Sequence, residues 1–200
     1  MPDIKSKNKI ITIVLTIIIL IAIFTIIYVN LPQDEKKNDK TSNGEIETFL
    51  TLIFGDERIN YTLQDIETLE SFTGKGTFIK VGWLPDVKLE GPFNFTGVKF
   101  NTILEQIDNL PNNYTVRVYS SDNKTTDYNQ STINGQVNIY NESGIITESA
   151  GVTMILAYKK EGKYLTDPEE EPFRVAFIND GKITASNLWA KMVISVEIIE

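Results

Sequence analysis

The 200-residue chain contains neither cysteine nor histidine. Without a thiol it can form no disulfide, so a fold outside the cytoplasm must rely on its core for stability. The two absences together also exclude Ser-His-Asp and Cys-His catalysis, zinc sites built from the usual ligands, and an imidazole that titrates near neutral pH. The catalytic chemistry open to this chain is therefore narrow.

Positive charge is also in short supply. The chain has 19 Lys and Arg against 27 Asp and Glu, which gives a formal net charge of −8 and a pI near 4.7. An acidic protein repels phosphate backbones and anionic lipid headgroups at long range. We therefore expect no nucleic-acid partner.

Charged residues are missing altogether from residues 10–29, which read IITIVLTIIILIAIFTIIYV. A helix of this length, at about 1.5 Å per residue, covers about 30 Å, which is the thickness of the hydrocarbon in a bilayer. A cleaved secretory signal is the alternative, but its apolar core is about 7–15 residues long and ends at a small-x-small cleavage site. Residues 28–32, YVNLP, contain no such site. We therefore predict a transmembrane helix that anchors the chain in the lipid bilayer.

The flanks of the predicted helix indicate its orientation. Lys5, Lys7 and Lys9 are the basic residues nearest to it, which favours a cytoplasmic location for residues 1–9. Residues 30–44 are polar and of mixed charge, so we expect a flexible stalk. Residues 45–200 suffice for one domain, which we place outside the cell membrane.

Six Asn-x-Ser/Thr sequons follow the predicted helix, at Asn60, Asn94, Asn113, Asn123, Asn129 and Asn141. Such sites are glycosylated in exported proteins, so their position supports an extracytoplasmic glycoprotein. The abundance of Ile, Asn and Lys suggests an archaeal origin.

The patterning of the domain predicts strands far more often than helices. β-formers or apolar alternation occur in residues 47–54, 114–119, 152–158, 173–178 and 192–199. Thr62 can cap a short helix that runs to Leu69. A second helix is expected from near Val98 until Pro111 stops it. The prediction is an α+β, mostly β fold with antiparallel or mixed sheets and a few short helices.

Three short motifs suggest chemistry, and each has a plainer interpretation. Residues 73–77, TGKGT, lack the first Gly and the Ser or Thr of a phosphate loop, so we expect a hairpin turn. Residues 121–124, SDNK, match Ser-x-x-Lys but are polar, so we expect a loop. Residues 167–171, DPEEE, lack the spacing of a calcium loop, so we expect a solvated charged turn.

Residues 91–107, GPFNFTGVKFNTILEQI, resemble a segment of the sulfite-oxidase-like, molybdopterin-binding domain family. In that family a strand ends in an aromatic-x-Gly-Val turn and a Leu-rich helix follows. Later pieces follow in the family's order: Ser121-Asp122, residues 155–158 with Gly162 and Leu165, residues 172–175, and residues 189–191. The resemblance covers about residues 61–199, and it implies that fold.

The resemblance also implies a cofactor, and the sequence departs from the family where that cofactor would be held. In the catalytic members a pterin dithiolene holds molybdenum and a cysteine adds a sulfur ligand, which the strand expected at residues 77–83 does not provide. The family's Asp-Gly-Tyr is replaced by residues 122–124, and its Gly-Gly by Glu170-Glu171. We therefore expect no cofactor, with molybdopterin as the one that the resemblance would allow.

Six residues are candidates for contact with a ligand in the family's cleft, because aromatic faces stack on flat rings and Arg or Lys meets an anion. They are Trp83, Tyr119, Asp122, Arg174, Trp189 and Lys191. The structural alternative places both Trp residues in the core or at its rim, and pairs Arg174 with a nearby carboxylate.

Three functions follow from these observations. The first is a non-catalytic module that binds a small anionic ligand or a neighbouring envelope protein. The second is a molybdopterin-dependent oxidoreductase in which an oxygen or solvent completes the metal sphere in place of cysteine. The third is a surface-structural domain. The missing cysteine favours the first.

Overall fold

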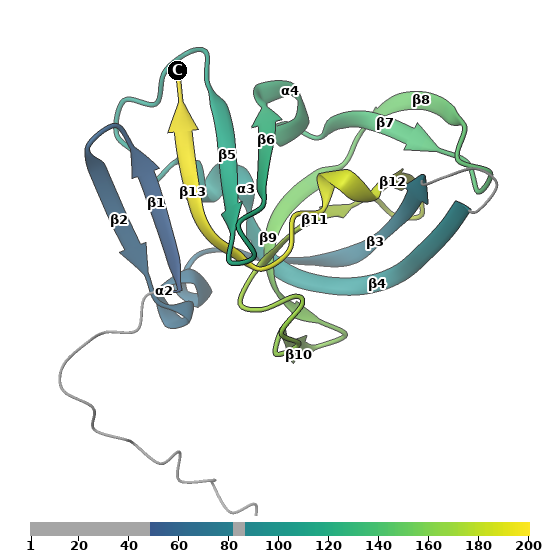
Figure 1. Cartoon of the computed structure of the whole chain (residues 1–200), viewed down its shortest axis with the longest axis horizontal. Coiled ribbons are helices and arrows are strands. Elements are labelled where there is room, and N and C mark those ends of the chain that lie inside the picture. Colours follow the sequence, from purple (N-terminus) through teal and green to yellow (C-terminus); the bar gives the residue numbers. More distant parts are fainter. Residues whose placement is uncertain (1–48, 82–86) are drawn as a thin grey trace, which may run out of the picture. The chain divides into compact units, whose positions relative to one another are not determined.

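The computed structural model describes residues 49–81 and 87–200 (Figure 1). These residues belong to one compact unit, Ile46–Glu200. The predicted cytoplasmic N-terminus, transmembrane helix and stalk lie outside the described residues. Within the two described ranges, every helix is too short or too polar to cross a bilayer.

The first sheet has five strands in the order β2-β1-β13-β5-β6. Its strands are β1 (Leu50–Phe54), β2 (Glu57–Tyr61), β5 (Thr115–Ser120), β6 (Thr125–Asn129) and β13 (Val193–Ile199). β1 and β13 are parallel, with Leu52 opposite Val196, and the other pairs are antiparallel. In β5, buried Val116 and Val118 alternate with partly exposed residues, so one face of this sheet packs on the core.

The second sheet has the strand order β10-β9-β4-β3-β12-β7-β8, and β11 pairs with β9 beside this path. Its strands are β3 (Ser71–Val81), β4 (Val87–Lys99), β7 (Gln136–Tyr140), β8 (Ile146–Gly151), β9 (Thr153–Lys160), β10 (Lys163–Tyr164), β11 (Arg174–Ile178) and β12 (Ile183–Ala185). β12 runs parallel to β3, and the other pairs are antiparallel. Both sheets are therefore mixed, and the predicted mostly β fold class is confirmed.

β9 and β11 are the two longest runs of buried residues in the second sheet. β9 is paired on one side with β4 and on the other with β11, and all five residues of β11 are buried. Strands that are buried on both faces consist mainly of consecutive apolar residues, as β9 and β11 do. The β11 backbone also holds the chain that leads into β13, because Val175 N donates to Ala190 O at 2.8 Å and Val193 N donates to Phe173 O at 2.8 Å.

The helices are short: α2 (Leu63–Thr68), α3 (Phe100–Leu104), α4 (Gln130–Ile133) and the 3-10 turn η1 (Ser186–Leu188). The predicted cap of α2 is confirmed as a reciprocal capping box. Asp65 N donates to Thr62 Oγ1 at 3.1 Å, and Thr62 N donates to Asp65 Oδ2 at 2.8 Å.

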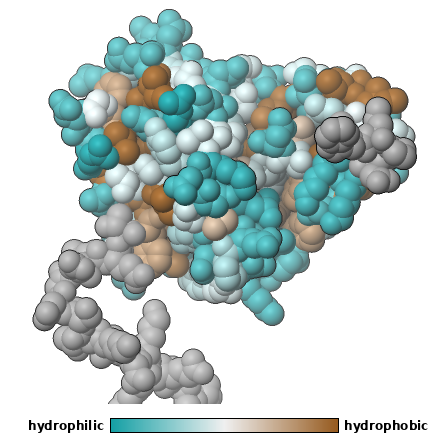
Figure 2. Space-filling model, in the orientation of Figure 1, coloured by the Kyte–Doolittle hydropathy of each residue, from teal (hydrophilic) through white to brown (hydrophobic). Residues whose placement is uncertain are grey.

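One contiguous core joins the two sheets, which lie side by side in Figure 1. Aromatic rings run through it: the Phe177 ring lies 6.5 Å from Tyr128 and 6.1 Å from Trp189, and Tyr128 lies 6.4 Å from Phe100. The face shown in Figure 2 is mostly hydrophilic, with hydrophobic residues in separate areas.

Two sequence predictions about local structure are wrong. Residues 73–77 lie inside β3, paired with β4, and form no hairpin turn. Close packing explains why a glycine stands at position 76 inside a strand, because a Cβ there would lie 2.5 Å from Trp189 Cη2 and 2.8 Å from Phe177 O. The second helix ends at Leu104, well before Pro111, because Gln106 N and Ile107 N bond to carbonyls three residues back and close turns instead.

Candidate binding cleft

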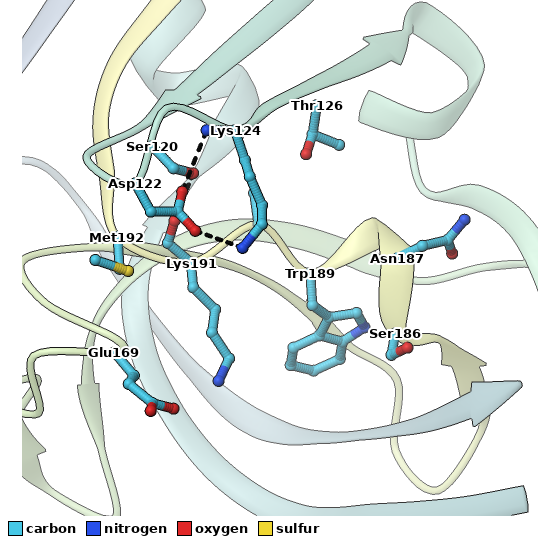
Figure 3. A pocket seen from close by; sticks show the side chains of 11 residues that line it. Ser120, Asp122, Lys124, Thr126, Glu169, Ser186, Asn187, Trp189, Lys191 and Met192 are labelled. Atoms are coloured by element: carbon cyan, nitrogen blue, oxygen red, sulfur yellow. Dashed lines mark hydrogen bonds and ion pairs between the residues drawn. The ribbon is translucent and has the colours of Figure 1, made fainter. Parts of the chain in front are cut away.

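A cleft of about 580 Å³ opens where the β5–β6 turn, η1 and the segment Ala190–Met192 meet (Figure 3). Its lining is about equally polar and apolar, and it carries both signs of charge, from Asp122, Lys124, Glu169 and Lys191. Hydroxyl and amide groups supply further donors and acceptors. The cleft therefore offers hydrogen bonds and charges beside an apolar surface.

The β5–β6 turn, at residues 121–124, forms the rim of the cleft. The sequence predicted a loop at these residues, and that prediction is confirmed. Asn123 N donates to Ser120 O at 3.0 Å, and Asn123 has a φ of 64°, which Asn tolerates in a tight turn. Lys124 Nζ donates to Asp122 Oδ2 at 2.5 Å, and this hydrogen bond lowers the pKa of the Asp122 carboxyl. The two rim charges therefore neutralise each other.

The segment Ala190–Met192 forms the wall that carries Lys191. Ser120 Oγ donates to Lys191 O at 2.6 Å, and Ser121 N donates to Met192 O at 2.9 Å, so the rim fixes this backbone. The Lys191 side chain extends into the space between Glu169 and Trp189 (Figure 3). Its Nζ lies 3.9 Å from Glu170 Oε1, at the outer limit of an ion pair.

Trp189 closes the floor of the cleft and is only 4% exposed. Its ring lies 4.8 Å from that of Phe78 and 5.6 Å from that of Phe95, and Nε1 donates to Thr184 Oγ1 at 2.9 Å. The indole is therefore engaged in the core, and little of it is left to stack on a ligand.

Arg174 lies beneath this floor and is 1% exposed. Its guanidinium carbon lies 5.7, 5.2 and 5.4 Å from the ring centres of Phe78, Phe95 and Trp189. Burial lowers the pKa of the Arg174 guanidinium, and the nearby Glu170 carboxylate works against that shift. Nη1 donates to Glu170 Oε1 at 2.5 Å, while Nε and Nη2 have no hydrogen-bond partner among the described residues.

Glu170 is the shared partner of the cations in this region. Lys160 Nζ lies 3.2 Å from both of its carboxylate oxygens, and Arg174 and Lys191 approach Oε1. The prediction of a solvated turn at residues 167–171 is therefore wrong at Glu170, which is buried. The buried Arg174 guanidinium in β11 needs a counter-charge, and Glu170, four residues earlier in the chain, supplies it.

The structure brings together some of the six sequence candidates. Asp122, Trp189 and Lys191 line the cleft, and Arg174 lies below it, paired with a carboxylate as its structural alternative predicted. Trp83 lies outside the described residues.

Tyr119 lies elsewhere, because side chains alternate along β5 and its neighbours Val118 and Ser120 face the buried side. Its hydroxyl donates to Glu197, and this bond raises the pKa of the Tyr119 phenol. Lys160, Glu169 and Glu170 are not among the six candidates, although Glu170 stands at the family's Gly-Gly position. Lys160 lies at the end of β9 and both glutamates lie in the loop before β11, so only the fold brings them to this region.

The residues of this region do not fit a molybdenum cofactor. The chain offers no thiol or imidazole to the metal. The described residues include no group of three or more Asp or Glu side chains placed to hold a metal ion. Glu170 already neutralises part of the cation cluster that would receive an anionic pterin.

Comparisons with known proteins support the fold and leave the function open. No family model matches the sequence, and no curated protein matches it. Among solved structures, the sulfane dehydrogenase SoxCD from Paracoccus pantotrophus has a similar fold, with a TM-score of 0.50 at 12% sequence identity. The match covers 78% of this chain and 39% of the SoxCD chain, so this chain spans well under half of that chain's length. The similarity is consistent with the sulfite-oxidase-like fold that the sequence resemblance implies.

Proposed function

We propose that this protein is a non-catalytic binding module, anchored in the cell membrane by residues 10–29, which holds a small anionic ligand outside the membrane. Lys191 carries the proposal. Its side chain is 39% exposed and extends into the cleft (Figure 3), and its ammonium group lies 3.9 Å from its ion partner Glu170. A cation held at such a distance keeps most of its capacity to bind an anion.

The lining of the cleft narrows the chemistry of the ligand. Lys124 is held by Asp122, so Lys191 is the cation available for the anionic group. Glu169 points into the same space, and its carboxylate requires a hydrogen-bond donor on the ligand. A small hydroxylated or amino-substituted organic acid meets both requirements. A volume of about 580 Å³ suits a ligand of that size.

The proposal of a non-catalytic role follows from the side chains that could act on a bound ligand. The chain has no thiol and no imidazole, and Asp122 is a weakened base because Lys124 lowers its pKa. These groups suit recognition better than proton transfer at neutral pH.

Ligand-induced stabilisation of the full chain in detergent tests this function. We expect malate to raise the unfolding temperature of the wild type and Lys191→Gln to abolish the increase. Lys163→Gln is the matched control, because Lys163 is exposed in β10 and lies outside the cleft. Equal responses in all three proteins, across carboxylates, sulfonates and phosphates, would contradict the proposal.

Metal analysis separates this function from molybdopterin-dependent oxidation. The protein is purified from its native membrane, and its molybdenum, tungsten and extractable pterin are measured. We expect none of these at a stoichiometric level. One metal with one pterin per chain would overturn the binding-module proposal in favour of the oxidoreductase.

A further inference from the structure

The turn between β7 and β8 carries one of the six sequons, Asn141-Glu142-Ser143, and all three residues are exposed. Two backbone hydrogen bonds close the turn. Asn141 N donates to Ile145 O at 2.9 Å, and Gly144 N donates to Asn141 O at 3.0 Å. Gly144 has a φ of 78°, a conformation that glycine adopts without strain. The sequon therefore has a fixed backbone on the surface of the domain.

The turn also fixes the Asn141 side chain. Its Oδ1 accepts hydrogen bonds from Ser143 N and from Ile145 N, both at 3.0 Å. Because the amide oxygen faces the turn, the Nδ2 group on the same planar amide points away from it. The first of these bonds joins Asn141 to the hydroxyl residue of its own sequon. The two residues that define a glycosylation signal are thus held together, with the reacting nitrogen on the outside.

Three of the other sequons lie in elements that use the Asn side chain or bury it. Asn94 is partly buried in β4, between β3 and β9. Asn60 lies in β2, where Thr51 Oγ1 donates to its Oδ1 at 3.0 Å. Asn129 caps α4, and its Oδ1 accepts from Thr132 N at 2.9 Å. A sugar at these positions would compete with the folded domain for space or for a hydrogen bond.

The remaining two sequons lack the geometry of the β7–β8 turn. Asn113 and Asn123 are exposed, but Asn123 lies in the turn that forms the rim of the cleft, where a sugar would cover the opening. All six sequons lie in the part of the chain that the structure describes. Among them, Asn141 is the one whose Oδ1 accepts from the backbone of its own Ser or Thr. It also lies outside the cleft.

An exposed apolar tip adjoins this sequon. Ile145 and Ile146 are 62% and 53% exposed, the highest values for large apolar side chains within the described residues. They lie at the start of β8, the last strand of the second sheet, which within the described ranges pairs with β7 alone. A free strand edge beside exposed apolar side chains favours pairing with another chain unless something covers it.

We propose that Asn141 carries an N-linked glycan, which covers Ile145, Ile146 and the free edge of β8. The inference goes beyond ligand binding and rests on the proposed function only for the location outside the membrane. Ile145 N lies 3.0 Å from Asn141 Oδ1, so the first sugar begins beside the apolar tip. The donor is an oligosaccharide carried on a lipid phosphate. Nδ2 forms a bond to the anomeric carbon, the bond from that carbon to the phosphate oxygen breaks, and Nδ2 gives up one proton as the lipid phosphate leaves.

Glycopeptide mass spectrometry on the protein from its native membrane tests the site. We expect sugar on Asn141. When the variants are expressed in the same cells, Asn141→Gln and Ser143→Ala should each lose the mass of one glycan. Ser143→Thr should keep it, because the signal requires a hydroxyl. Asn138→Gln is the matched control, because it changes an exposed Asn of β7 that belongs to no sequon. It should keep the glycan.

Sedimentation velocity of the full chain in detergent tests the covering role. Ser143→Ala is the informative variant, because it keeps Asn141 and the backbone N–H groups that bond to it. We expect its dissociation constant for self-association to be at least about tenfold lower than that of the wild type, since isoleucine side chains become buried between chains. Adding Ile145→Ser and Ile146→Ser should restore the wild-type value.

Several outcomes would overturn the inference. An unmodified Asn141 in the native protein, or a glycan that Ser143→Ala retains, would remove the site. Equal self-association of the wild type and Ser143→Ala would remove the covering role. The malate test keeps the proposed function separate. A response that depends on Lys191 together with an unmodified Asn141 overturns this inference alone, and a glycosylated Asn141 without a malate response overturns the ligand-binding proposal alone.

Discussion

Two arginine–carboxylate pairs in this molecule have the same chemistry and opposite surroundings. Arg117 and Asp127 form a bidentate pair on the first sheet, with both bonds at 2.8 Å and side chains 39% and 47% exposed. Arg174 and Glu170 form a single bond in the interior, at the edge of the cleft. The exposed pair has the better hydrogen-bond geometry. Removal of one partner should nevertheless destabilise the protein more at the buried pair, because water cannot replace the missing group.

The two arginines also differ in the sign of their pKa shifts. The hydrogen bonds that Arg117 donates to Asp127 raise the pKa of Arg117, whereas burial lowers the pKa of Arg174 although a carboxylate lies beside it. Desolvation disfavours the charged form of Arg174, and Glu170 only partly offsets that effect. Burial, more than pairing geometry, decides how much each pair affects folding and binding.

Removing the buried arginine should have the largest effect. Arg174→Ala leaves Glu170 without its closest partner and opens a space against Phe78, Phe95 and Trp189. We expect a loss of about 3–5 kcal/mol in the free energy of unfolding. Urea denaturation of the domain measures it. Arg117→Ala is the control, and a similar loss in both variants would refute the contrast between the two regions.

Replacement of the cleft floor should have the next largest effect. Trp189→Phe removes the donor to Thr184 Oγ1 and leaves part of the space between Phe78 and Phe95 unfilled. We expect a loss of about 2 kcal/mol in the free energy of unfolding, from the cavity and the buried hydrogen bond together. Thermal and urea unfolding measure the change. A variant as stable as the wild type would show that the floor does not depend on the indole.

The distance along the chain between interacting residues explains how much of this structure the sequence could predict. The cap at Thr62, the alternation of β5 and the turn at residues 121–124 are local features, and all three are confirmed. Local spacing contains the information for them, because the interacting groups lie within a few residues of each other.

The long-range features could not be predicted in the same way. Gly76 looks like a turn residue, and only the position of Trp189 explains why it lies in a strand. Glu170 looks like part of a solvated charge run, and the approach of Arg174 and Lys160 in the folded sheet explains its burial. The cations that meet at Glu170 are therefore not recognisable in the sequence, because they come together only when the sheet is assembled.

A carboxylate with intermediate exposure should lose its stabilising effect in acid. Hydrogen bonds from Lys80 and Lys88 lower the pKa of Glu90 from 4.5 to about 2, while its side chain is 22% exposed. A pKa that folding depresses stabilises the protein above pH 4.5 and loses that effect as the pH falls toward 2. We expect Glu90→Gln to cost about 1 kcal/mol at pH 7, since both lysines are largely exposed.

Unfolding measured between pH 7 and pH 2 checks this expectation. The stability of Glu90→Gln should change less than that of the wild type below pH 4.5, so that the two curves converge in acid. Parallel curves across the whole range would show that Glu90 contributes no pH-dependent stability.

The exposed arginine pair should have the smallest effect, despite its geometry. A double-mutant cycle with Arg117→Ala and Asp127→Ala should give a coupling near the error of the measurement, and added salt should reduce it further. The same cycle on Arg174 and Glu170 should give a clear coupling that salt hardly changes, because solvent ions do not reach a buried pair. If salt weakens both couplings equally, water and ions reach Arg174 as readily as Arg117, and the contrast between the two pairs is wrong.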